Sequence, residues 1–237
     1  HGLCMSHHCW ESGDENLSSN MAETLGYTPV YLDYNTGRCI ADNGLELATQ
    51  LDQLVDIWPV NVSDITIVGH SMGGLVARSA RYYGEKNNCG WIQINKTMVS
   101  IGTPHAGAPL EKVASVLENL MQLSPYAIPF TRLTKIRSQG IENLRHGEII
   151  APGDKFVPLP IGVEYFALAA TLNKQEKFTT EKFLGDGLVT PDSAFGQGKD
   201  STCTLLIPDQ NKWLGYELGH NEMLTNAGVF EQLGTWL

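Results

Sequence analysis

Residues 65–74 read Ile-Thr-Ile-Val-Gly-His-Ser-Met-Gly-Gly, and this stretch decides the fold. Its first four residues are β-branched and predict a buried strand. Residues 69–73 match the pattern G-x-S-x-G, and the apolar residues of 73–83 recur at helical spacing. A serine on a sharp turn from strand to helix holds its Oγ clear of the sheet edge, where the start of the helix favours negative charge. The sequence therefore predicts a nucleophilic serine, Ser71, in strained backbone geometry.

Strand-like and helix-like patterns alternate on both sides of this turn. We expect further strands at 30–34, 96–101, 163–170 and 202–207, a helix that follows a cap at Asn43 and ends before Pro59, and a terminal helix at 222–237. This alternation is typical of an α/β fold with a mainly parallel sheet and helices on both faces. Sites in such sheets lie at the carboxyl ends of the strands.

The stretch from 110 to 150 interrupts the alternation. It predicts helical pieces at 110–123, 130–138 and 141–145, broken by Pro125 and Pro129. We interpret it as a cap or lid insertion within a single domain spanning 1–237. Its apolar residues are candidates for an acyl pocket, and ordinary helix packing is the alternative for each; they are Leu117, Leu120, Met121, Leu123, Ile128 and Phe130.

A serine nucleophile needs a base, and the base needs an orienting carboxylate. After a G-x-S-x-G turn the expected chain order is serine, acid, histidine. His220 is the last histidine and lies in a loop after the last predicted strand. Asp186 is the best acid, because its two glycine neighbours let the carboxylate turn inward; Asp192 and Asp209 are the alternatives.

Two backbone N–H groups are expected to stabilise the oxyanion of the tetrahedral intermediate. One belongs to Met72, which follows the nucleophile. The other belongs to Leu3, because His1-Gly2-Leu3 fits the loop that follows an early strand in such folds. We therefore expect the N-terminal strands of the fold to be missing from this sequence.

Composition narrows the possible partners. The chain has 237 residues, of which 42% are hydrophobic and 18% charged, and a formal net charge of −10, which disfavours nucleic acid. No apolar run approaches the roughly 18 residues that span a bilayer.

The five cysteines are odd in number; free thiols favour a reducing compartment such as the cytoplasm, although a disulfide remains open. Residues 4–9 contain Cys4, His7, His8 and Cys9, but no second ligand pair follows at zinc-site spacing, so we expect no metal.

Five motifs together resemble the lipase/esterase branch of the α/β-hydrolases: His-Gly-Leu at 1–3, Gly-His-Ser-Met-Gly-Gly at 69–74, Ile-Gly-Thr-Pro-His-Ala-Gly at 101–107, Gly-Asp-Gly-Leu-Val at 185–189 and Gly-His at 219–220. The similarity is greatest to bacterial lipase-like and GPI inositol-deacylase-like serine hydrolases. It implies an α/β-hydrolase fold and no organic cofactor. It also implies the triad Ser71, Asp186 and His220, oxyanion donors at Leu3 and Met72, and packing or hydrogen-bonding roles for His70 and His105.

The resulting expectation is cleavage of a small-molecule or lipid carboxylic ester through an acyl-Ser71 intermediate. Acyl transfer and thioester cleavage are alternatives, because they share the chemistry up to the acyl-enzyme. A non-catalytic α/β-hydrolase scaffold is a third alternative, disfavoured by the presence of all three triad residue types.

Overall fold

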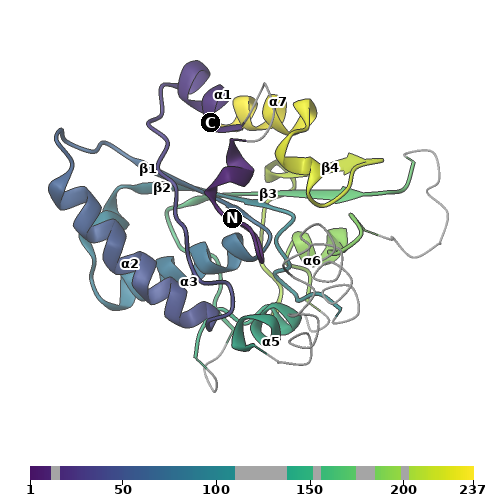
Figure 1. Cartoon of the computed structure of the whole chain (residues 1–237), viewed down its shortest axis with the longest axis horizontal. Coiled ribbons are helices and arrows are strands. Elements are labelled where there is room, and N and C mark those ends of the chain that lie inside the picture. The colour runs from purple at the N-terminus through teal and green to yellow at the C-terminus, as the bar shows by residue number, and fades with distance from the viewer. Residues whose placement is uncertain (12–16, 110–137, 152–155, 175–184, 199–202) are drawn as a thin grey trace, which may run out of the picture.

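Four parallel strands form the sheet at the centre of the protein (Figure 1). The computed structural model describes residues 1–11, 17–109, 138–151, 156–174, 185–198 and 203–237. The strand order follows the sequence, β1-β2-β3-β4, and the strands are β1 (Ile65–His70), β2 (Asn95–Ile101), β3 (Glu164–Thr171) and β4 (Lys212–Tyr216). Every neighbouring pair is parallel, so the carboxyl ends of all four strands lie at one edge.

Alternate residues of the central strands face opposite layers, because side chains alternate with a period of two along a strand. In β2 and β3, Val99 and Phe166 are register partners and pack in one hydrophobic cluster, whereas Met98 and Tyr165 pack in another. The sheet is therefore buried on both faces, as parallel sheets are.

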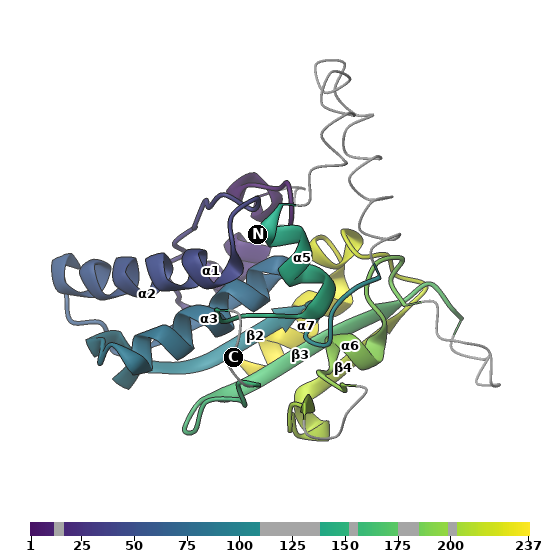
Figure 2. The ribbon, with the colours of Figure 1, turned by 90° about the horizontal axis from the view of Figure 1, so that it is seen from below.

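Helices cover both faces (Figure 1). On one side α2 (Ile40–Ile57) and α3 (Met72–Lys86) run side by side, and α3 packs on β1 (Figure 2). On the other side lie α1 (Leu17–Leu25) and α7 (Ala227–Trp236), which contact each other. The other helical elements of the described residues are α5 (Gln139–His146), α6 (Pro191–Ala194) and the 3₁₀ turns η1 (His7–Trp10), η2 (Gly90–Gln93), η5 (Asp209–Asn211) and η6 (Glu222–Leu224). The predicted α/β fold, with a parallel sheet between two helical layers, is confirmed.

Two of the predicted strands are wrong. Residues 30–34 and 203–207 have no strand assignment and lie outside the sheet that the structure describes. The fourth strand is instead β4, whose short run Lys-Trp-Leu-Gly-Tyr lacks a continuous β-branched pattern. It becomes a strand through its pairing with β3, from Ala167 opposite Lys212 to Thr171 opposite Tyr216.

Helix boundaries also differ from the prediction. The second helix begins at Ile40, one turn before Asn43, which is buried and donates from Nδ2 to the backbone oxygen of Asn35 instead of capping. The terminal segment is η6 followed by α7, because the side chain of Asn226 caps a new helix at Val229 N–H. The α5 helix confirms a helical piece near 141–145. Residues 110–137 lie outside the described residues, so the cap or lid insertion stays a prediction.

Within the ranges described above, no helix is both long enough and apolar enough to cross a membrane.

Candidate active site

Ser71 stands on the turn between β1 and α3. It has φ 53° and ψ −123°, a conformation that L-residues seldom adopt and that is typical of functional sites. Its backbone N–H donates to the carbonyl oxygen of Ile101, at the end of β2, over 2.8 Å. The residue is 3% exposed. The strained strand-to-helix turn predicted for this serine is therefore present at the carboxyl edge of the sheet.

The glycines on either side of Ser71 allow this turn to close. A Cβ added to Gly69 would lie 2.5 Å from the backbone nitrogen of Gly74, within the helix start. A Cβ on Gly73 would lie 2.7 Å from the carbonyl oxygen of His1. Real Cβ contacts are not this short, so any larger residue would force the backbone apart.

Asp186 and His220 are hydrogen-bonded. The Nδ1 of His220 lies 2.7 Å from Oδ2 of Asp186, and the His220 backbone N–H donates to the Asp186 carbonyl oxygen over 3.0 Å. The other carboxylate oxygen of Asp186 accepts the N–H groups of Leu188 and Val189 at 2.9 and 2.7 Å. Asp186 is 4% exposed, so its buried carboxylate is held by several donors.

This pairing determines which nitrogen of His220 is available for chemistry. An ionised carboxylate only accepts hydrogen bonds, so Nδ1 of His220 carries the proton and Nε2 keeps its lone pair. That Nε2 is buried and forms no hydrogen bond with any part of the chain the structure describes. It is the atom that a general base uses in this arrangement.

Gly102 and its neighbour Ile101 connect the imidazole of His220 to the turn that carries Ser71. A Cβ on Gly102 would lie 3.1 Å from both Cε1 and Nδ1 of His220 and 3.4 Å from Oδ2 of Asp186. Gly102 directly follows Ile101, whose carbonyl oxygen holds the N–H of Ser71. The end of β2 therefore contacts the nucleophile turn on one side and the His–Asp pair on the other.

His70 lies in the same cluster. It is fully buried, and its ring centroid lies 4.8 Å from that of His220. Burial, with a smaller contribution from His220, holds the pKa of His70 well below its usual value. His70 is therefore neutral, and Nε2–H donates to the carbonyl oxygen of His220 at 3.1 Å.

The first residues of the chain lie against the nucleophile turn. A Cβ on Gly2 would lie 3.2 Å from Cβ of Ser71 and 3.1 Å from Nδ1 of His70. Leu3 is buried, and Met72, the first residue of α3, is fully buried. Backbone N–H groups of a first helical turn have no partner within the helix. The two predicted oxyanion donors thus belong to segments that the structure brings together beside Ser71.

A sequence model of the PGAP1-like alpha/beta domain family matches residues 32–158, which is more than half of the chain. The chain belongs to this family. The matched range begins before α2 and includes the nucleophile turn, β2 and α5. No curated protein sequence matches the chain.

Solved structures agree with the fold of this PGAP1-like domain. The mature form of the Bacillus licheniformis lipase BlEst2 superposes with a TM-score of 0.60 at 22% identity, over 99% of this chain and 89% of that one. The propeptide form of the same lipase gives 0.59 at 20% identity, over 99% of this chain and 49% of that one. At this identity the likeness establishes the α/β-hydrolase fold.

The alternative acids do not reach His220 in this PGAP1-like domain. Asp192 is exposed in the short helix α6. The side chain of Asp209 is 99% exposed and its Oδ1 lies 2.9 Å from Nζ of Lys212. Of the three predicted candidates, the structure brings only Asp186 to the imidazole.

His105 belongs to a second buried network. Its Nδ1 lies 3.4 Å from a guanidinium nitrogen of Arg78, and its Nε2 lies 3.3 Å from the hydroxyl of Tyr165. Burial, followed by the charge of Arg78, lowers the pKa of His105 well below its usual value. Arg78 also donates to the carbonyl oxygen of Val157 over 2.6 Å. The hydrogen-bonding role expected for His105 agrees with these contacts.

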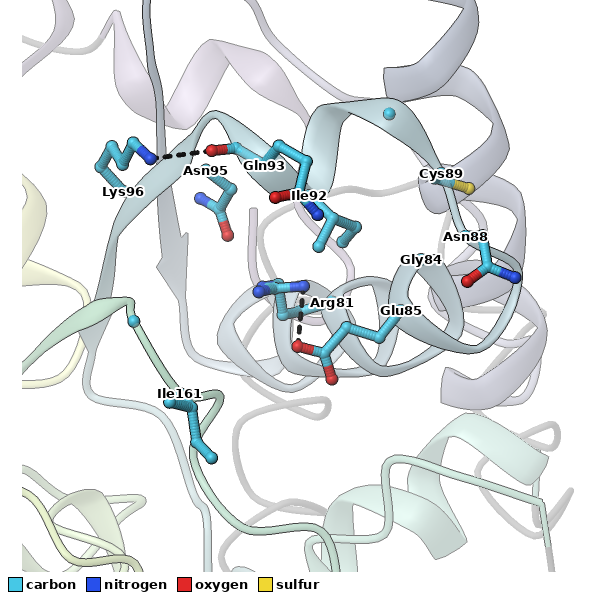
Figure 3. Close-up of a pocket in the computed structure, with 12 residues that line it drawn as sticks. Arg81, Gly84, Glu85, Asn88, Cys89, Ile92, Gln93, Asn95, Lys96 and Ile161 are labelled. Carbon is cyan, nitrogen blue, oxygen red and sulfur yellow. Dashed lines mark hydrogen bonds and ion pairs between the residues drawn. The ribbon is translucent and has the colours of Figure 1, made fainter.

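A pocket of about 500 Å³ lies away from this cluster, between the last turns of α3 and the start of β2 (Figure 3). Arg81 and Glu85 form an ion pair of 3.0 Å on its α3 side, and Lys96 donates to the carbonyl oxygen of Gln93 on its β2 side. The pocket lies at the amino end of β2, whereas Ser71 lies at the carboxyl end of β1, so it is not a pocket for a group bound to Ser71.

Sequence reasoning missed the contact of Gly102 with His220, and it gave His70 a packing or hydrogen-bonding role without its partner, the carbonyl oxygen of His220. The motif Ile-Gly-Thr-Pro at 101–104 was noted as a family feature, but its contact with the imidazole depends on strand pairing. All five cysteines, which include Cys39, Cys89 and Cys203, lie in the part of the chain that the structure describes, and no disulfide joins any two of them there.

Proposed function

We propose that this protein is a serine hydrolase that cleaves carboxylic esters. The observation that carries the proposal is the buried Asp186–His220 pair, whose unpartnered Nε2 lies in the cluster that also contains the turn of Ser71. A polarised base beside a strained serine is the arrangement that serine acyl transfer needs.

The reaction would proceed in two halves. His220 Nε2 takes the proton of Ser71 as Oγ attacks the ester carbonyl, and the N–H groups of Met72 and Leu3 stabilise the oxyanion. Collapse of the tetrahedral intermediate breaks the ester C–O bond, and the imidazolium returns the proton to the departing alcohol. Water then attacks the acyl-Ser71 with His220 again as base, which releases the carboxylic acid and restores the hydroxyl.

Asp186 has an electrostatic role in this scheme. As His220 gains a proton, the carboxylate 2.7 Å from Nδ1 stabilises the positive charge and keeps the ring oriented. The N–H groups of Leu188 and Val189 hold that carboxylate in place while it does so.

Labelling with a fluorophosphonate tests the proposal directly. The probe phosphonylates an activated serine, so we expect one label per chain, at Ser71, and none in Ser71→Ala. Ser63→Ala is the matched control, since Ser63 is exposed and its hydroxyl donates to Oδ2 of the neighbouring Asp64. A chain that takes no label would fit a non-catalytic scaffold and refute the proposal.

A panel of nitrophenyl esters of increasing acyl length would then define the acyl preference. Added alcohols and matching thioesters compare hydrolysis with acyl transfer and thioester cleavage. We expect the free acid to be the main product; a main product made on the added alcohol would assign acyl transfer instead.

A further inference from the structure

Three potential metal ligands converge on η1, outside the active site. One ligand atom from each of His7, His8 and Glu11 lies within 4.8 Å of the other two. The rings of His7 and His8 have centroids 4.0 Å apart, and Nδ1 of His8 lies 3.5 Å from Oε2 of Glu11. Residues three apart in a 3₁₀ turn share one side, so the local fold places His8 beside Glu11.

Asp33, from a distant part of the sequence, orients His7. Its Oδ1 accepts the His7 backbone N–H over 2.7 Å, and its Oδ2 lies 2.5 Å from Nδ1 of His7. Carboxylate oxygens accept hydrogen bonds, and both contacts place an oxygen of Asp33 against a nitrogen of His7. Nδ1 of His7 therefore donates, and Nε2 keeps a lone pair. A carboxylate on one ring nitrogen with the other free is the usual environment of a metal-binding histidine.

We propose that His7, His8 and Glu11 bind one divalent transition-metal ion of the zinc type, with Asp33 holding His7 in the binding tautomer. Two imidazoles and a carboxylate are a ligand set that zinc accepts, with a fourth position for water. Ligand atoms on a tetrahedral zinc ion lie about 3.3 Å apart, given bonds of about 2.0 Å. His8 and Glu11 are largely exposed, so their side chains are free to rotate toward the ring of His7 that Asp33 holds in place.

The ligand chemistry also determines which ions fit. Imidazole nitrogen suits zinc, cobalt, nickel and copper, whereas magnesium and calcium take oxygen ligands almost exclusively. The site offers two nitrogens against one carboxylate. We therefore expect binding of Zn²⁺ and Co²⁺ and none of Mg²⁺ at the same concentration.

A bound ion would tie the start of the chain to residues 33–34. Asp33 lies 3.6 Å from Nε2 of His1, and the hydroxyl of Tyr34 donates to the His1 carbonyl oxygen over 2.7 Å. His1 in turn packs on Gly73. Because an ion binds the folded arrangement and not the unfolded chain, it should raise the melting temperature.

Titration of the full chain with Co²⁺ is the test, followed by displacement with Zn²⁺. A tetrahedral site gives strong visible d–d absorption, and we expect one ion per chain. Removing a residue that only hydrogen-bonds to a metal ligand already weakens metal binding about tenfold or more. Loss of a ligand itself should cost more, so we expect His8→Ala and Glu11→Ala each to weaken Co²⁺ binding by more than about tenfold. His146→Ala and Asp209→Asn are matched controls at exposed positions and should bind as the parent does.

The neighbouring thiols of Cys4 and Cys9 are the alternative ligands that the test has to exclude. The double variant Cys4→Ser/Cys9→Ser should keep the visible spectrum, whereas its loss would assign the ion to sulfur and overturn the proposal. Absence of stoichiometric Co²⁺ binding, or unchanged affinity in His8→Ala and Glu11→Ala, would also overturn it. The readouts do not involve ester hydrolysis, so this proposal and the proposed function can fail separately.

Discussion

His70 and His220 are joined across 150 positions of sequence, because Nε2 of His70 donates to the backbone carbonyl oxygen of His220 at 3.1 Å. One histidine belongs to β1 and the other to the loop that follows β4. The neutral, buried His70 therefore holds the backbone of the loop that carries the proposed base. Because this hydrogen bond is to the main chain of His220, both ring nitrogens of His220 are left for Asp186 and the proposed nucleophile.

Replacement of His70 tests this positioning role. His70→Phe keeps an aromatic ring but removes the donor, so the loop loses an anchor and we expect kcat to fall about tenfold to a hundredfold with KM little changed. His70→Gln can still donate from its amide and should retain most of the activity. Ester hydrolysis kinetics measure both. Equal losses in the two variants would argue for packing alone.

Asp186→Asn should separate charge from shape. The amide is nearly isosteric but cannot stabilise an imidazolium, and it favours the wrong tautomer of His220. We expect kcat to fall about ten-thousandfold while circular dichroism stays unchanged. Asp192→Asn, at an exposed position, is the matched control and should keep parental activity. A comparable loss in Asp192→Asn would move the acid to that residue.

Gly102→Ala should damage the site more than the fold. Gly102 has φ 57°, and the new Cβ would lie 3.1 Å from two atoms of the His220 ring. We expect a stability loss of about 1–2 kcal/mol from the backbone and a fall in kcat of at least about tenfold from the displaced imidazole. Chemical denaturation and ester kinetics measure the two effects.

Gly162→Ala separates these two effects. Gly162 has φ 78°, but nothing lies within 4 Å of an added Cβ. It should therefore show the backbone cost without loss of activity. If Gly162→Ala slowed hydrolysis as much as Gly102→Ala, general destabilisation would explain both variants.

Stability should fall as the pH is lowered below about 6.5, the usual pKa of histidine. The pKa values of His70 and His105 are both well below this in the folded protein, chiefly because of burial. The unfolded chain then binds more protons than the folded one, so stability is full above this pH and is lost as the pH falls. The slope should reach about 1.4 kcal/mol per pH unit for each imidazole.

Urea unfolding between pH 7.5 and 5.5 measures this slope, in a range where carboxylates with ordinary pKa values stay ionised. His105→Gln should reduce it, because one buried imidazole no longer titrates. His146→Gln should not, because His146 is exposed. A flat dependence in the parent protein would contradict the neutral state of both buried histidines.

The core of the fold was predictable from local patterns. The β-branched run of β1, the tight Gly-x-Ser-x-Gly turn and the apolar spacing of α3 are properties of neighbouring residues, and sterics act on them directly. Residues 110–137, which make up most of the predicted insertion at 110–150 and contain its acyl-pocket candidates, lie outside the described residues. The strand at 202–207 was wrong, because apolar residues such as Leu205 can be buried in irregular structure as well as in a sheet.

The residues of the site likewise divide into those that local sequence predicts and those that only the tertiary structure identifies. Ser71 could be identified from its own neighbours, and chain order was enough to nominate His220. The sequence favoured Asp186 over Asp192 and Asp209 from its glycine neighbours and position, but which carboxylate reaches the imidazole depends on the tertiary structure. The pairing of Asp33 with His7 likewise has no signal in the sequence, because 26 positions separate them.

The amino-acid sequence by itself determined the nucleophile turn and the α/β alternation, because backbone sterics and side-chain periodicity act over a few residues. Only the tertiary structure decided β4, the Asp186–His220 pair, the contact of Gly102 with the imidazole and the link from His70. Each of these depends on the register of parallel strands, which brings the ends of distant segments to one edge.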